Sequence, residues 1–120
     1  MVARILSILL AIFGLGATHG WAQEASAADD VRKGHDLAVL ICAYCHLAAP
    51  DQAAMPFLKP PAPSFESIAQ RKTLSVDFIR TFMATTHRDI RNPKGMPNPE
   101  LADFQIEQVG AYIMSLRRRP

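Results

Sequence analysis

The first helical pattern of apolar residues runs from Asp29 to Cys45. Its apolar members recur at intervals of three, four and six residues, and they are Val31, Leu37, Ala38, Ile41 and Tyr44. This spacing puts them on one face of a helix, and Asp29 or Asp30 can cap its N-terminus. His35 lies on the same helix, and we interpret it as an exposed or core-edge residue rather than a ligand.

Three further segments predict helices in the second half of the chain. Residues 65–70 form a short helix that Ser64 can cap, and a longer helix begins after Ser75, with Asp77 in its first turn. The apolar stripe of the longer helix consists of Val76, Ile79, Phe82 and Met83, with Phe78 beside it. A last helix runs from about Asp103 to Leu116, with Asp103 standing in as its cap. Arg117 to Arg119 then complement its C-terminal dipole.

Two glycines lie inside the outer helices, Gly34 in the first and Gly110 in the last. A glycine inside a helix costs about 1 kcal/mol relative to alanine, so each position needs a structural reason. We predict that they mark the point where the first and last helices cross, because the two backbones approach closely there.

Two proline-containing stretches separate the helices. Residues 47–63 contain five of the nine prolines, which excludes regular structure and stiffens the path. The apolar members of this stretch are Met55 and Phe57, and we interpret Met55 as a packing residue. The second stretch, residues 87–99, holds Met96 between a glycine and a proline. A backbone restricted on both sides of Met96 would direct its thioether toward a metal from a fixed direction.

The N-terminus has the pattern of a secretory signal. Arg4 precedes an apolar run of twelve residues, Ile5 to Gly16, which is shorter than the roughly 20 residues that cross a bilayer. The signal could be cleaved after Ala22, with Gly20 at the −3 position, or after Ala27, with Ala25 at the −3 position. An uncleaved anchor is the alternative. We therefore divide the chain into a signal peptide, residues 1–27, and one domain, residues 28–120.

Charge and size narrow the class of protein. The net charge is +2, and removing residues 1–27 leaves it unchanged, because one cation and one anion leave together. Such a balance gives no reason to invoke nucleic acid. A domain this small buries a modest fraction of its surface and often needs a covalent or metal staple.

The chemistry is concentrated in one motif, Cys42-Ala43-Tyr44-Cys45-His46. Two thiols three positions apart, followed directly by an imidazole, are the attachment pattern for c-type haem, in which the histidine ligates the iron. A thioredoxin-like couple, half a zinc site or a local disulfide are the alternatives. The first lacks a preceding strand, and the zinc site lacks further cysteines. Haem attachment also agrees with export to an oxidising compartment.

The order of these parts resembles that of the small bacterial class I cytochromes c. The shared features are a helix with Gly34 eight residues before Cys42, the haem motif, a proline-containing loop, two short helices, a Gly-Met-Pro loop and a C-terminal helix. The resemblance covers about Asp29 to Arg117. It implies an all-α fold of three to five short helices wrapped around one covalently bound haem, with the N- and C-terminal helices crossing.

The resemblance also implies residue roles. Cys42 and Cys45 match the thioether-forming cysteines, His46 the proximal iron ligand and Met96 the distal one. Pro63 matches the proline whose carbonyl accepts the proton of the proximal histidine's other nitrogen, with Pro60 and Pro61 as alternatives, and Arg71 matches an arginine that meets a haem propionate. Tyr112 matches the aromatic residue at the crossing of the terminal helices.

These roles describe an electron carrier rather than an enzyme, because two protein ligands leave no iron position open for a substrate. We predict a periplasmic monohaem cytochrome that shuttles single electrons from a donor dehydrogenase to an acceptor oxidase or reductase. A haem subunit dedicated to one dehydrogenase is a close alternative. A gas- or peroxide-reactive haem protein is the rival if Met96 does not bind, with Met83 and His87 as backup ligands. Five cations either steer an acidic partner or lie on a dispersed solvated surface. They are Lys72, Arg80, Arg88, Arg91 and Lys94.

Overall fold

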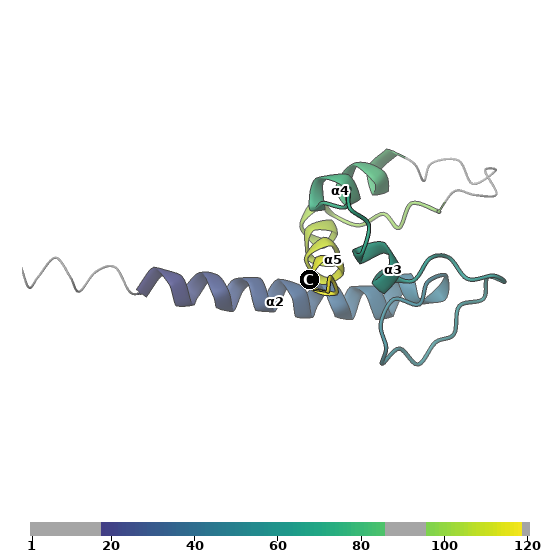
Figure 1. Ribbon diagram of the computed structural model, residues 1–120, viewed down its shortest axis with the longest axis horizontal. Coiled ribbons are helices and arrows are strands. Elements are labelled where there is room, and N and C mark those ends of the chain that lie inside the picture. Colours follow the sequence, from purple (N-terminus) through teal and green to yellow (C-terminus); the bar gives the residue numbers. More distant parts are fainter. Residues whose placement is uncertain (1–17, 86–95, 119–120) are drawn as a thin grey trace, which may run out of the picture.

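The computed structural model describes residues 18–85 and 96–118, and this part of the chain is all-α (Figure 1). Its elements are α2 (Thr18–Ile41), the 3-10 helix η1 (Cys42–Tyr44), α3 (Phe65–Ala69), α4 (Val76–Thr85) and α5 (Asp103–Ser115). No strand occurs in the described ranges, which contain one isolated bridge between His46 and Ala62. The predicted fold class is confirmed.

The first helix is longer than its apolar pattern suggested. α2 begins at Thr18, so Asp29 and Asp30 lie in its interior. The prediction that one of them caps the helix is therefore wrong. Asp29 instead pairs along the helix with Lys33 at 2.7 Å and Arg32 at 2.6 Å. The N-terminal part of α2 projects beyond the other helices (Figure 1), and residues 23–28 are exposed.

The crossing of α2 and α5 depends on Gly34. A Cβ atom at Gly34 would lie 1.9 Å from the carbonyl oxygen of Gln108 and 2.9 Å from Cβ of Tyr112. Only a glycine allows this approach. The predictions that Gly34 and Tyr112 lie where the first and last helices cross are therefore confirmed. The prediction for Gly110 is wrong, because a Cβ there would face Val76 of α4 at 3.2 Å.

The caps of the later helices are partly as predicted. The hydroxyl oxygen of Ser64 accepts the N–H of Ser67 at 3.1 Å, and that of Ser75 accepts the N–H of Phe78 at 3.0 Å. Asp103 is not the cap of α5, because the helix starts with it. The orphan N–H of Ala102 is satisfied by the side-chain oxygen of Gln105 at 2.9 Å.

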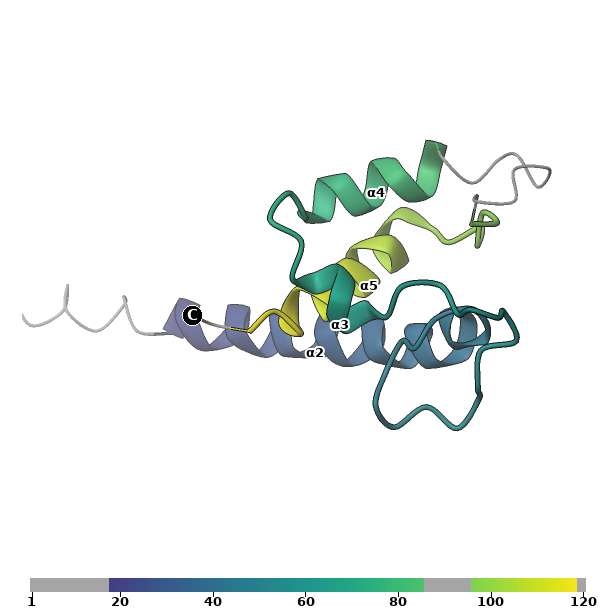
Figure 2. The ribbon, with the colours of Figure 1, turned by 45° about the vertical axis from the view of Figure 1, so that its right-hand side comes forward.

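The core lies where α5 is enclosed by the other helices. α5 contacts α2, α3 and α4, and it runs between α2 and α4 (Figure 2). Val109 of α5 is fully buried, and Tyr112 is 5% exposed with its hydroxyl donating to the carbonyl of Ala48 at 3.2 Å. The remaining buried apolar residues are Ala38, Cys42, Ala43, Ala48, Ala49, Phe65, Ala69, Leu74, Ile79, Met83, Ile106 and Ile113.

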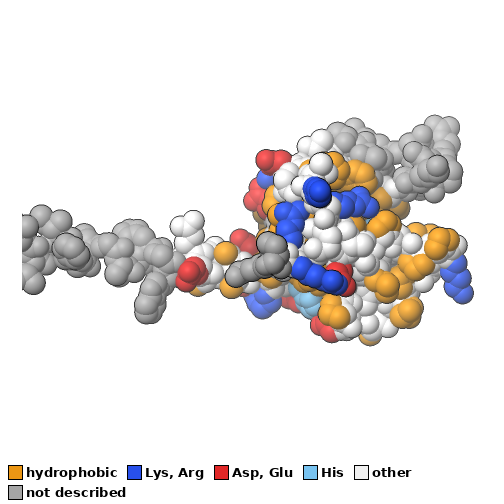
Figure 3. All heavy atoms as spheres, viewed as in Figure 1, with side chains coloured by type: hydrophobic (Ala, Val, Ile, Leu, Met, Phe, Trp, Pro, Cys, Tyr) orange, Lys and Arg blue, Asp and Glu red, His pale blue; other side chains and the backbone are white. Residues whose placement is uncertain are grey.

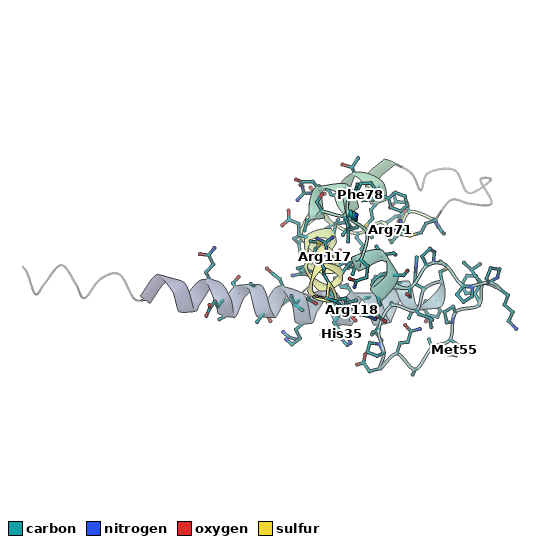
Figure 4. All side chains as sticks on the ribbon, viewed as in Figure 1. His35, Met55, Arg71, Phe78, Arg117 and Arg118 are labelled. Atoms are coloured by element: carbon teal, nitrogen blue, oxygen red, sulfur yellow. The ribbon has the colours of Figure 1, made fainter. Side chains whose placement is uncertain are left out.

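The loop of residues 47–63 does not cover the core with its large apolar side chains. Met55 is 77% exposed and Phe57 is 67% exposed, so the interpretation of Met55 as a packing residue is wrong. Figure 4 shows Met55 on the outer side of the loop. Hydrophobic side chains gather on this end of the molecule (Figure 3).

The C-terminal arginines bind other elements rather than the end of α5. The guanidinium of Arg117 donates to the carbonyls of Ala69 at 2.9 Å, Arg71 at 3.0 Å and Leu74 at 3.3 Å, and Arg118 pairs with Glu66. The role of these two residues in the α5 dipole stays a prediction, and Arg119 lies outside the described residues. Within residues 18–85 and 96–118, no helix is long and apolar enough to cross a membrane.

Candidate functional site

A cavity of about 270 Å³ opens between η1, α3, α4, α5 and the segment that precedes α5. Most of its lining is apolar, with Ile41, Phe65, Ile68, Leu74, Phe78, Ile79, Phe82, Met83, Val109 and Ile113 among its walls. Cys42, Cys45, His46, Arg71 and Met96 line the same cavity. Five predicted site residues from three separate parts of the sequence are thus brought together around one space.

The 3-10 helix presents both thiols to this cavity. η1 follows α2 directly, and the carbonyl of Cys42 accepts the N–H of Cys45 at 3.1 Å, the spacing of a 3-10 turn, and the N–H of His46 at 2.9 Å, the spacing of an α-helical turn. The two cysteines are not bonded to each other. Burial, followed by the charge of Cys45, raises the pKa of the Cys42 thiol to about 11, so this thiol stays protonated at neutral pH.

His46 is buried, and its ring is held from the far side of the loop. Its Nδ1 lies 2.7 Å from the carbonyl oxygen of Pro63, and its ring centroid lies 5.4 Å from that of Phe65. A carbonyl can only accept, so the proton must reside on Nδ1. The lone pair is then on Nε2, which is the form of imidazole that ligates a metal.

Three prolines were candidates for this contact, and Pro63 is the one whose carbonyl accepts from His46. The N–H of Ala62 donates to the carbonyl of Cys45 at 3.0 Å, and Ala62 also bridges to His46. The end of the loop therefore runs beside the motif. The hydrogen bond is the one that the resemblance implied for Pro63, and the choice among the three prolines depends on the path of the whole loop.

Two methionines also line the cavity. Met83 of α4 is 6% exposed, and Met96 is half-buried at the start of the segment that leads to α5. His87, the other backup ligand, lies outside the described residues.

Arg71 lies at the edge of the cavity, between α3 and α4 (Figure 4). Its side chain is exposed, while its backbone carbonyl is held by Arg117 at 3.0 Å. An exposed guanidinium at the rim of an apolar cavity suits an anionic group that projects from the cavity into solvent.

The cations considered for partner steering differ in their surroundings. Arg80 lies 2.6 Å from Glu107 and 2.6 Å from Asp77, and the bond to Glu107 raises the pKa of its guanidinium. Its charge is therefore balanced locally. Lys72 is exposed, and Arg88, Arg91 and Lys94 lie outside the described residues.

The donor set fits a haem. It comprises two thiols that are not paired in a disulfide, an imidazole with its lone pair on Nε2, and two thioether side chains that line the same cavity. The rings of Phe78 and Phe82 stack at 6.0 Å and line the cavity, yet they remain 44% and 39% exposed. A flat apolar group in the cavity would cover part of this surface, and burial of apolar surface is favourable.

Sequence reasoning missed two residues that support the site. The carboxamide of Gln52 makes four hydrogen bonds within the loop after His46, and Arg117 ties the turn between α3 and α4 to the end of α5. Neither belongs to a motif. Their partners are backbone carbonyls and amides, which leave no side-chain signal in a sequence.

Comparison with known proteins yields one informative relative. The chain is 35% identical over 94 residues to a protein named Cytochrome c-552 from Bradyrhizobium diazoefficiens. The match spans 78% of this chain and 82% of that protein. No family model matches the chain, and no solved structure does.

Proposed function

Because the chain belongs to the cytochrome c family, with haem c as its covalent cofactor, we propose that it is a periplasmic monohaem carrier of single electrons. Its partners would be a donor dehydrogenase and an acceptor oxidase or reductase, which bind transiently. The observation that carries the proposal is that Cys42, Cys45, His46 and Met96 line one apolar cavity. Export is supported by the signal-like pattern of residues 1–27.

The proximal side is assigned to the motif. Cys42 and Cys45 form the two thioethers, and His46 binds the iron through Nε2 because Nδ1 donates to Pro63 at 2.7 Å. A bond of this kind fixes the ring orientation and makes the imidazole a more basic ligand. Arg71 at the rim meets a propionate.

The distal side is assigned to Met96. Its thioether enters the cavity from a segment with prolines at positions 97 and 99, which restrict the backbone. When bound, haem supplies an iron that alternates between Fe(II) and Fe(III), and a thioether ligand raises the potential relative to a second imidazole. His46 and Met96 would be the two protein ligands of this iron, and the chain's own part would be to keep these side chains in place in both oxidation states.

Met83 provides the matched control for testing this assignment, since it lines the same cavity from α4. We expect Met96→Ala to abolish the weak far-red absorption band that reports iron–thioether bonding in the ferric protein. Met83→Leu, which preserves apolar volume, should retain the band. The absorption spectra of the two purified holoproteins check this prediction.

Two other outcomes would change the proposal. A band that survives in Met96→Ala and disappears in Met83→Leu would show that Met83 of α4, rather than Met96, binds the iron. Absence of the band in the wild-type protein would leave an iron position open and favour a gas- or peroxide-reactive haem protein. Haem attachment itself is tested by peroxidase staining of a denaturing gel, which loses its signal if Cys42 and Cys45 are replaced by serine.

A further inference from the structure

The segment that follows His46 has no regular secondary structure, yet part of it is buried. Ala48 and Ala49 are 1% and 8% exposed, and residues 47–63 contain no helix. Buried backbone N–H groups require hydrogen-bond partners. These two amides must therefore find acceptors outside regular secondary structure.

The side chain of Gln52 supplies them. Its Oε1 accepts the N–H groups of Ala48 at 2.6 Å and Ala49 at 3.0 Å. Its Nε2 donates to the carbonyls of Ala54 at 2.7 Å and His46 at 3.3 Å. A carboxamide has two donor hydrogens and two acceptor lone pairs, so its whole capacity is used. If the oxygen and nitrogen were exchanged, the NH₂ group would face the N–H groups of Ala48 and Ala49, and the oxygen would face two carbonyls. The orientation of the carboxamide is therefore fixed.

The bond from Gln52 to the carbonyl of His46 is one of three that hold this residue. The N–H of His46 donates to Cys42 at 2.9 Å, and the ring Nδ1 lies 2.7 Å from the carbonyl of Pro63. The first two bonds act on the backbone on either side of Cα, and the third acts on the ring. The orientation of the imidazole toward Pro63 depends on how firmly the backbone is held.

We propose that Gln52 is a positioning residue for the haem site: its carboxamide fixes the backbone of His46 and so keeps the imidazole bonded to Pro63. The inference rests on the proposed function, because it concerns the residue assigned as the proximal ligand. Gln52 does not line the cavity and acts through His46 alone.

Two substitutions separate the parts of this network. Gln52→Met retains the length of the side chain and removes all four hydrogen bonds. Gln52→Glu retains an acceptor for Ala48 and Ala49 and removes both donors, including the one to His46. Gln70 is the matched control. It is another glutamine whose Nε2 donates to backbone carbonyls, those of Glu66 at 3.4 Å and Leu116 at 3.2 Å, and it does not line the cavity.

The measurement is hydrogen exchange of the His46 ring Nδ1–H, followed by NMR in the reduced, diamagnetic holoprotein. We expect this exchange to be about fivefold faster in Gln52→Glu and in Gln52→Met, because losing a hydrogen bond of about 1 kcal/mol changes an equilibrium constant by about that factor. It should be unchanged in Gln70→Met. The amide of buried Val109 in α5 reports global opening and should exchange at the wild-type rate in all three variants.

The proposal is overturned if the His46 ring exchanges at the wild-type rate in Gln52→Glu. It is also overturned if Val109 accelerates by the same factor, since Gln52 would then contribute only to overall stability. If Gln52→Met does not accumulate as holoprotein, Gln52→Glu alone decides. Absence of the far-red band in the wild-type protein would count against Met96 as a ligand. It would not affect the test of Gln52, which concerns His46.

Discussion

At the residue scale, two glycines that look alike in the sequence have different surroundings. Gly34 lies against the backbone of α5, where a methyl group would meet the carbonyl oxygen of Gln108 at 1.9 Å. Gly110 faces the side chain of Val76 at 3.2 Å, a contact that a small shift relieves. The helical pattern identified both positions as unusual, but the identity of the neighbouring atoms depends on the angle at which the helices cross.

We therefore expect Gly34→Ala to destabilise the holoprotein by about 3 kcal/mol, because backbone must move to accept the methyl group. Gly110→Ala should change the free energy of unfolding by less than about 1 kcal/mol, since the better helix propensity of alanine offsets the crowding at Val76. Denaturant unfolding of the two variants and the wild type checks this expectation. Equal losses in both variants would contradict the close approach of α2 and α5 at Gly34.

At the scale of elements, side chains of α2 and α5 hold the loop that follows the motif. His35 of α2 lies 2.8 Å from Asp51 of the loop, and its ring packs edge-on against Tyr112 at 5.2 Å. Tyr112 in turn donates to Ala48. The prediction that His35 is a core-edge residue is confirmed, with 29% of its side chain exposed.

The pair of His35 and Asp51 predicts a pH dependence of stability. The hydrogen bond to Asp51, with a smaller contribution from Asp36, raises the pKa of His35 above 6.5, and His35 lowers the pKa of Asp51 below 3.8. The stabilisation is therefore complete between these two unfolded-state values. It is lost as pH rises through the folded pKa of His35 and as pH falls through that of Asp51.

The free-energy loss caused by Asp51→Asn should accordingly be largest between roughly pH 4 and 6.5 and should decline toward pH 9. Urea unfolding across this range measures it. The control is the same substitution in a His35→Asn background, where the loss should no longer vary with pH. A loss that stays constant in the wild-type background would show that the pair does not act through charge.

At the scale of the whole molecule, the two candidate cleavage sites differ only in residues that are exposed on α2. Residues 23–28 are exposed on the projecting part of α2. Tertiary contacts are made by Asp30, whose Oδ1 lies 3.5 Å from Nε2 of Gln108, and by Val31, which packs against the core. Cleavage after Ala22 or after Ala27 would leave these contacts intact.

We expect the protein recovered from a periplasmic fraction to begin at residue 23 or residue 28, as determined by mass spectrometry. Holoproteins that begin at these two positions should unfold at the same temperature within about 2 °C, because the difference concerns exposed residues alone. Recovery of the full-length chain from the membrane fraction would support the uncleaved anchor. A lower unfolding temperature for the shorter form would mean that residues 23–27 contact the domain.

The sequence by itself determined the three later helices, the caps at Ser64 and Ser75 and the haem motif, because each depends on residues within a few positions of one another, but it did not give the start of α2. Family membership agrees with what the motif predicted. Tertiary structure alone decided that Gly110 faces α4, that Met55 is exposed, that Arg117 binds the turn between α3 and α4, and that Gln52 supports His46. These contacts join backbone groups or surfaces far apart in the chain, and such contacts exist only once the helices and loops are packed.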